Sequence, residues 1–207
     1  MNSNLRAVFN LSLCLAIAFF AGLALPDTTA AAEKDRKVIS LPDPQKTGGK
    51  PLMSALNERK TNRNISSDKI SEQELSNLLW AAWGINRNDG KRTAPTAMNK
   101  QNVEVYAAIE SGVWLYDAKK NELLSVTEND ERGKFSGAAV TLLYAAPSND
   151  PYSAMHIGSL YQSAGLYCAS AGLANVVKAG GRNALNDSLK LPKGYEVFVV
   201  QLVGYPK

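Results

Sequence analysis

The feature that most constrains the fold is a pair of alternating segments joined by almost no chain. Residues 103–109, VEVYAAI, and 112–117, GVWLYD, are rich in Val, Tyr and Trp, and only Glu110 and Ser111 lie between them. Strands joined by so short a turn pair antiparallel. Residues 138–146, AAVTLLYAA, are apolar without alternation and predict a strand covered on both faces. We therefore expect a central, mainly antiparallel sheet.

Helical patterns occur between these strands. Ser71 and Glu74 form a predicted capping box ahead of leucines at helical spacing, and Gly84 is the expected stop. A long helix is expected over 153–171, where many small residues lower helix propensity and require close packing as compensation. Shorter helices are predicted over 53–60 and 181–191, a turn and short strand over 118–127, and strands over 174–178 and 195–205. The order predicts an α+β fold with a sheet layered by helices.

The first 32 residues have the pattern of a secretory signal peptide. A cation at Arg6 precedes an apolar run from Leu11 to Leu25, then Pro26 and an Ala30-x-Ala32 cleavage site. The run is shorter than the roughly 20 residues that span a bilayer, although an uncleaved anchor is the alternative. We expect a periplasmic or secreted protein with no stable membrane insertion after cleavage.

The mature chain is predicted to comprise an extended arm, residues 33–52, and one domain, residues 53–207. Cleavage would remove one cation and one anion, so the net charge stays at +4, which is too small and dispersed for a nucleic-acid partner. Cys168 would be the single remaining cysteine, so no intrachain disulfide forms, and we expect a buried core thiol. With one His as well, a metal site is not expected. We expect His156, near a helix start, to be a surface or interface group.

Two polar clusters are candidate binding sites. The first, ERKTNR, places Arg59, Lys60 and Arg63 beside the hydroxyl of Thr61. Cations and a hydroxyl donor in a short turn can hold a phosphate, although a solvated basic surface is the alternative.

The second cluster is RTAPTAMNKQ, residues 92–101. Pro95 restricts the backbone, and Thr96, Asn99 and Gln101 can donate and accept hydrogen bonds. Such groups suit the edge of a planar heterocycle. The alternative is an ordinary polar surface loop that is hydrated and binds no ligand.

Five segments, in order over residues 38–207, resemble the nitroreductase-like FMN flavoproteins, and within them the compact branch related to thiazoline and oxazoline dehydrogenases. ERKTNR is similar to an Arg-Arg-Ser-x-Arg type motif, and RTAPTAMNKQ to an Arg-Thr-x-Pro-Ser-x-x-Asn-x-Gln loop. SEQELSNLLWAAWG, HIGSLYQSAGLYCASAGLANVVK and LPKGYEVFVVQLVGYP resemble the family's helix after the first motif, its long interface helix and its closing strand.

The resemblance implies a nitroreductase-like fold and a homodimer with two FMN molecules at the subunit interface. It implies that the cofactor carries hydride or electrons in a ping-pong cycle, from a small-molecule donor such as NAD(P)H to an electron-poor acceptor such as a nitro compound or quinone, with no catalytic side chain. The implied FMN contacts fall on the first motif, the polar loop, the backbone near N5 and the terminal cation: Arg59, Lys60, Thr61, Arg63, Pro95, Thr96, Ala97, Asn99, Gln101, Val177, Lys178, Ala179 and Lys207.

Several positions depart from the family pattern. Lys60 and Thr61 replace Arg and Ser, and Ala174 and Ala179 stand where Gly is expected, which limits how closely the backbone approaches the ring. A flavin- or small-ligand-binding module without turnover is therefore the alternative function. A structural exported dimer whose basic cluster binds another anion is a third.

Overall fold

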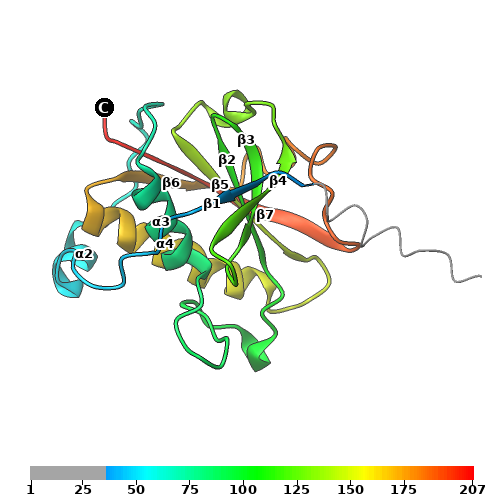
Figure 1. Cartoon of the computed structure of the whole chain (residues 1–207), viewed down its shortest axis with the longest axis horizontal. Coiled ribbons are helices and arrows are strands. Elements are labelled where there is room, and N and C mark those ends of the chain that lie inside the picture. The colour runs from blue at the N-terminus through cyan, green and yellow to red at the C-terminus, as the bar shows by residue number, and fades with distance from the viewer. Residues whose placement is uncertain (1–35) are drawn as a thin grey trace, which may run out of the picture. The chain divides into compact units, whose positions relative to one another are not determined.

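The computed structural model describes residues 36–207, and it consists of one seven-stranded sheet with helices packed against it (Figure 1). The predicted signal peptide, residues 1–32, lies outside the described residues. Every strand pair is antiparallel, in the order β1-β4-β3-β2-β5-β7-β6. The strands are β1 Val38–Ser40, β2 Glu104–Ile109, β3 Gly112–Asp117, β4 Glu122–Thr127, β5 Val140–Pro147, β6 Ala174–Lys178 and β7 Tyr195–Gly204.

The predicted hairpin is confirmed. β2 and β3 pair from Tyr106 opposite Leu115 to Ile109 opposite Gly112, with Glu110 and Ser111 as the two-residue turn. Gly112 has φ +130°, and a Cβ there would lie 2.1 Å from the carbonyl oxygen of Thr127. Only glycine can therefore occupy this position.

Three helices are present in the described part of the chain: α2 Leu52–Glu58, α3 Glu72–Trp83 and α4 Ser153–Ala171. The capping box at the start of α3 is confirmed, because Ser71 accepts from the backbone of Glu74 and Glu74 accepts from the backbone of Ser71. Gly172 ends α4 in the left-handed conformation. The long helix has the bounds that the sequence predicted.

The sheet is covered on both faces, which explains why β5 shows no alternation. Val105, Ala107 and Leu142 belong to the core beneath α3 and α4, which lie side by side in Figure 1. Their neighbours in sequence, such as Tyr106 and Leu143, belong to a second core on the opposite face. That face is covered by a 3-10 turn, η2 Arg132–Phe135, and by the segment that follows β6.

The helix predicted over 181–191 does not form. Residues 180–188 make consecutive turns in which the amide of Ala184 donates to Gly181 and that of Ser188 donates to Leu185. Asn, Asp and Ser side chains compete with the helical backbone, and two glycines precede the segment. Leu185 is nevertheless buried. The apolar residues of this segment therefore indicated burial correctly, whereas the predicted helical backbone was wrong.

The predicted N-terminal arm contributes one strand to the sheet. β1 pairs with β4, with Val38 opposite Leu124 and Ser40 opposite Glu122, at the edge of the sheet. Between β1 and α2 the chain forms no helix or strand. A helix that is both long and apolar enough to cross a bilayer is absent from residues 36–207.

Small residues of α4 allow it to pack closely on the sheet. Beneath Gly165, the hydroxyl of Tyr144 donates to Gln201 at 2.6 Å, and the amide of Gln201 donates to Asn175 at 3.1 Å. The Cα of Gly165 faces this network, since a Cβ there would lie 3.6 Å from Oδ1 of Asn175. Cys168 on the same helix is fully buried, as expected, and burial raises the pKa of its thiol to about 12.

Candidate functional site

The first motif forms an exposed turn, residues 59–63, that we call the basic turn. It begins where α2 ends, with the amide of Arg59 donating to Ala55. The amide of Asn62 donates to the carbonyl of Asn175 in β6 at 2.9 Å, which attaches the turn to the edge of the sheet. Arg59, Lys60, Thr61 and Arg63 are all exposed to solvent.

The C-terminus lies beside the basic turn. The amide of Lys207 donates to Asn64 at 3.1 Å, and the Asn64 side chain donates back to the carbonyl of Lys207 at 3.2 Å. Lys60 and Asn62 also line a pocket of about 230 Å³ against the end of α4 and the start of β6. The structure thus gathers the four residues of the first motif and the terminal cation in one region.

The second motif forms a loop, residues 92–101, that we call the polar loop. It is attached to the C-terminal end of α3. The Arg92 guanidinium donates to the carbonyl of Trp83 at 2.9 Å and lies 4.4 Å from the centre of its ring, and the Thr93 hydroxyl donates to Trp80. Burial lowers the pKa of Arg92. It remains charged at neutral pH because guanidinium pKa values lie far higher.

The tip of the polar loop has a strained backbone. Met98, Asn99 and Gln101 have φ of 54°, 53° and 47°, which is unfavourable for residues with a side chain and is concentrated at functional sites. The Gln101 side chain donates to Asn99 at 3.0 Å and accepts from Arg92 at 2.9 Å. The backbone of Gln101 donates to the Thr96 hydroxyl.

This hydrogen-bonded tip opens on a shallow pocket. The pocket has a volume of about 210 Å³ and is lined by cationic, amide and hydroxyl groups together with a proline. Its walls are Arg87, Lys91, Arg92, Ala94, Pro95, Thr96, Asn99 and Gln101. Ala97, also predicted to shape the site, lies behind this wall and is half-buried.

His156 holds the polar loop in place, so its predicted position at the surface was wrong. Only 1% of its surface is exposed, because the loop folds over the start of α4. Its Nε2 accepts a hydrogen bond of 2.8 Å from the amide of Ala97, which requires a neutral imidazole with the proton on Nδ1. Burial lowers the pKa of His156, although the nearby Asp150 carboxylate opposes this.

Asp150, in the turn just before α4, makes a second attachment for the polar loop. Its carboxylate accepts from Lys100 at 2.8 Å and from Asn102 at 3.0 Å. These contacts hold the pKa of Asp150 at about 2, with the Lys100 hydrogen bond as the largest cause. Neither His156 nor Asp150 was identified as a site residue from the sequence. A lone histidine near a helix start was the available signal, and its partner lies 59 residues away.

The third predicted element, the end of β6, lies at a sheet edge. Asn175 directs its carbonyl outward to Asn62, and backbone groups in an antiparallel strand alternate in direction. Those of Val177 therefore also point away from β7. The Lys178 side chain turns to the other sheet face, where it donates to Ser136 at 3.2 Å, and Ala179 is exposed.

The structure does not bring all the predicted residues together in one protomer. The basic turn, Lys207 and the start of β6 lie at the C-terminal end of α4, where α2 packs (Figure 1). The polar loop lies at its N-terminal end, through the contacts of His156 and Asp150. The 19 residues of α4 separate the two groups by about 27 Å at 1.5 Å per residue.

Comparison with known proteins identifies the fold and the family. The family model described as Nitroreductase matches residues 56–205. The chain therefore belongs to the nitroreductase family, as its motifs indicated. In the part that the structure describes, no group of three or more His, Cys, Asp or Glu residues is placed to hold a metal ion.

Individual relatives agree with this assignment. A crystal structure of a nitroreductase-family protein from Ralstonia eutropha is 33% identical, with a TM-score of 0.76 over 82% of this chain and 90% of that one. A nitroreductase-family protein of Methanocaldococcus jannaschii is 25% identical over 118 residues. That match covers 54% of this chain and 58% of the relative, so the chain spans little more than half of that protein.

Two more distant structures share the fold. A chain of the Escherichia coli microcin synthetase McbBCD complex has 19% identity and a TM-score of 0.63 over 89% of this chain and 83% of that one. A nitroreductase from Bacteroides fragilis with bound FMN has 15% identity and a TM-score of 0.54, over 76% and 89%. The nitroreductase-like fold expected from the sequence is confirmed.

Proposed function

We propose that this protein is an FMN-dependent oxidoreductase that works as a homodimer, with each site built from both subunits. The separation of the basic turn and the polar loop along α4 carries this proposal. Neither group alone offers both a cationic phosphate site and a polar edge for the ring. Two α4 helices packed antiparallel about a twofold axis would place the basic turn of one protomer beside the polar loop of its partner.

Exposed apolar side chains favour the same arrangement. Near the C-terminal end of α4, α2 exposes Leu52 and Met53, which are 64% and 74% accessible. Near the N-terminal end, Met98 and Met155 are 75% and 58% accessible. Between them, the outer face of α4 carries small residues such as Ser159 that permit close helix approach. Exposed apolar side chains at both ends of one helix favour an interaction surface along it.

The residues fit the chemistry of FMN. A dianionic phosphate matches the exposed cations Arg59, Lys60 and Arg63, the hydroxyl of Thr61 and the neighbouring Lys207. The donors and acceptors of Asn99 and Gln101 match the carbonyl and imino edge of the ring, with Pro95, Thr96 and Ala97 shaping its face.

The outward backbone of Val177, beside Lys178 and Ala179, would approach the reactive edge of the ring. Buried polar atoms without a partner among the described residues, Oδ1 of Asn102 and Nδ1 of His156, lie directly behind the polar loop. Such unpaired groups are uncommon in native structures and fit a site that is completed by a ligand.

Bound FMN would supply hydride and electron transfer between a small-molecule donor and an electron-poor acceptor, such as a nitro compound or quinone. The protein would bind and orient the ring, exclude water from one face and place cations near the edge where negative charge develops. No ionisable side chain is required to form a covalent bond. Donor and acceptor would use the same exposed ring face in turn.

The cofactor is tested by native mass spectrometry and by titration with FMN. The unmodified protein should retain FMN or bind it when reconstituted, bleach with a reductant and recover its colour with a quinone. Loss of one charged hydrogen bond costs about 1.5–3 kcal/mol, so Arg59→Ala should weaken FMN binding about ten- to hundredfold. Lys120→Ala, at an exposed turn, is the matched control. Colourless protein that cannot be reconstituted would refute the cofactor assignment.

The dimer is tested by sedimentation of Ser159→Arg, which places a charge on the outer face of α4. This variant should become monomeric and lose FMN affinity together, while its circular dichroism remains that of the unchanged protein. A monomer that binds FMN normally would contradict the shared site.

A binding module without turnover is the second candidate, favoured by Ala179 where the family pattern has Gly. The added methyl lies where the backbone is proposed to approach the ring. Protein that binds FMN, is not reoxidised by any quinone or nitroarene and gains turnover on Ala179→Gly would support this alternative.

We also propose that residues 1–32 are a cleaved leader and that the mature chain, arm 33–52 and domain 53–207, acts in the periplasm or outside the cell. The apolar run between Arg6 and Pro26 supports this. N-terminal sequencing after cell fractionation tests it. Intact Met1 in a cytoplasmic fraction would refute it.

A further inference from the structure

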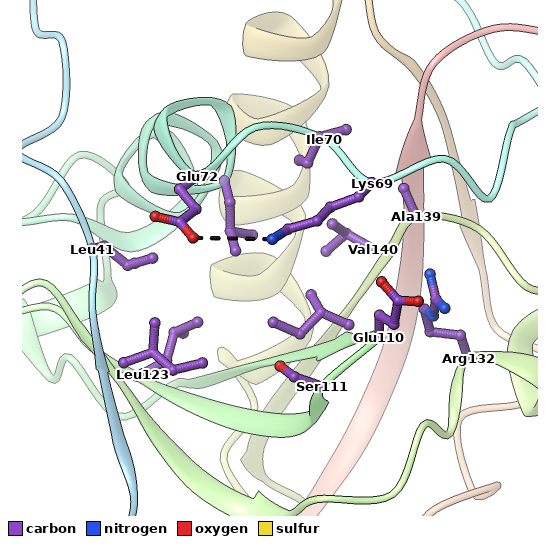
Figure 2. A pocket seen from close by; sticks show the side chains of 13 residues that line it. Leu41, Lys69, Ile70, Glu72, Glu110, Ser111, Leu123, Arg132, Ala139 and Val140 are labelled. Carbon is purple, nitrogen blue, oxygen red and sulfur yellow. Dashed lines mark ion pairs between the residues drawn. The ribbon is translucent and has the colours of Figure 1, made fainter.

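A third pocket lies at the end of α3 that is remote from the polar loop (Figure 2). It has a volume of about 180 Å³ and is more enclosed than the two pockets of the proposed FMN site. Its walls come from β1, the start of α3, the β2–β3 hairpin, β4 and the residues leading into β5. None of the residues assigned to FMN lines it.

The interior of this pocket is apolar. Leu75 of α3, Leu123 of β4 and Val140 of β5 belong to the main core, yet they also face the pocket. Leu41 and Ile70 complete the wall on the side of β1 and α3. Filling an apolar pocket with an apolar molecule removes apolar surface from water, which is favourable.

Cationic and acidic side chains lie next to one another at the mouth of the pocket. Lys69 lies 4.0 Å from Glu72, and Figure 2 shows the two side chains extending toward each other across the opening. Arg132 pairs with Asp130 at 2.8 Å and lies close to Glu110. Both cations at the mouth therefore have a carboxylate partner.

The ion pair over the mouth is also weak. The Lys69 and Glu72 side chains are 70% and 66% exposed, and such pairs contribute little to stability. They can separate at small cost to admit a ligand. The Ser111 side chain is exposed beside them and offers a hydroxyl to a single polar atom.

We propose that this pocket binds a small neutral molecule of the size of one substituted aromatic ring. A cavity of about 150 Å³ lined by Leu, Ile and Phe in another protein accepts benzene, so about 180 Å³ accommodates a ring with a small substituent. The apolar interior selects against carboxylate or ammonium groups on the ligand, because either charge would lose its hydration there.

This site is distinct from the proposed FMN site. Glu72, the first residue of α3, lines the pocket, whereas Trp83, the last residue, holds the polar loop. The 12 residues of α3 place the two sites about 17 Å apart along the helix axis. The inference therefore stands or falls independently of flavin binding.

The test is a titration of the purified protein with toluene, followed by NMR of its isotope-labelled methyl groups. Toluene should shift the Leu75, Leu123 and Val140 methyls in a saturable manner and leave Leu185, on the opposite sheet face, unchanged. Benzoate and benzylammonium carry the same ring with a charge, and they should produce no saturable shift. The same titrations with and without FMN separate this pocket from the flavin.

Two variants block the pocket from different walls. Ser111→Trp acts from the exposed hairpin turn and Ile39→Trp from the edge strand, and both should abolish the shifts, whereas Ser111→Ala should retain them. Two blocking variants are used so that the test still works if one of them does not fold. Circular dichroism shows whether each variant is folded. Absence of saturable shifts in the unmodified protein, shifts that persist in both blocked variants, or equal binding of benzoate would each overturn the proposal.

Discussion

Replacing His156 gives the sharpest test of how the polar loop is held. Its Nε2 accepts from the amide of Ala97, and its ring stacks on Tyr152 at 6.2 Å between centroids. His156→Leu keeps an apolar group of similar bulk and removes the acceptor. His156→Gln restores an acceptor on a side chain of similar reach. The two variants therefore separate loss of the hydrogen bond from loss of packing.

The magnitude follows from the contact that is lost. A buried donor left without its acceptor costs about 1–3 kcal/mol. We expect the hydrogen bond from Ala97 to His156 to fix the strained tip at Asn99 and Gln101. Without it, ordering the loop around FMN would make the free energy of binding less favourable by this amount. Because each 1.4 kcal/mol is a factor of ten, FMN affinity should fall about five- to hundredfold in His156→Leu. His156→Gln should retain most of the affinity.

The assay is a titration of FMN fluorescence at several pH values. The pKa of His156 is lowered in the folded state, so the unfolded imidazole binds a proton more readily. Its contribution to stability is complete above pH 6.5, the ordinary value, and is lost as the pH falls below it. Protonation also removes the acceptor, so the loop should loosen over the same range. The charged groups that face the ring are Asp150, which opposes the shift, and Lys100, which adds to it.

His156→Gln is also the control for pH, because the FMN phosphate itself titrates near pH 6. The unmodified protein should lose more affinity on acidification than His156→Gln does. Equal losses in the two proteins would refute the role of the imidazole, and normal FMN affinity in a folded His156→Leu would refute the anchor.

Three further predictions concern stability and reactivity. Gln201→Leu leaves Tyr144 and Asn175 without a buried partner and should lower the free energy of unfolding by about 3 kcal/mol, or roughly 6–12 °C in melting temperature, as calorimetry would show. Gly165→Ala should raise stability by up to about 1 kcal/mol, since a Cβ there meets neighbours at ordinary contact distances; a loss in chemical denaturation would contradict this. Cys168, with its pKa raised to about 12, should resist thiol reagents at pH 8 until the protein unfolds, so rapid labelling of native protein would exclude the buried thiol.

Local sequence signals predicted most of the elements. The two-residue turn at Glu110 and Ser111 and the capping box of Ser71 and Glu74 involve residues within a few positions of each other, so their patterns are visible in the sequence. The helix predicted over 181–191 failed for a related reason. Its apolar spacing was helical, but the packing of Leu185 against the second sheet face is satisfied equally well by consecutive turns.

The candidate site was predictable only in part. The motif residues were recognised by resemblance, and their contacts with FMN stay predictions. What the sequence could not supply was the arrangement along α4, because it depends on contacts such as Asn62 with Asn175 and Ala97 with His156, which join distant segments. The pocket near Leu75 was also not foreseen, since its apolar residues have the pattern of ordinary core.

The short strand β1 has a consequence for how this protein can aggregate. It supplies only three residues to one margin of the sheet, and Lys37 and Glu128 place an ion pair beside it. The opposite margin, β6, is engaged by Asn62. Neither edge of the described sheet presents a long row of unpaired backbone N–H and C=O groups to which a strand of another chain could add. Fibril growth by strand addition is therefore disfavoured. The proposed dimer would instead use helical surfaces, where two subunits form a closed pair.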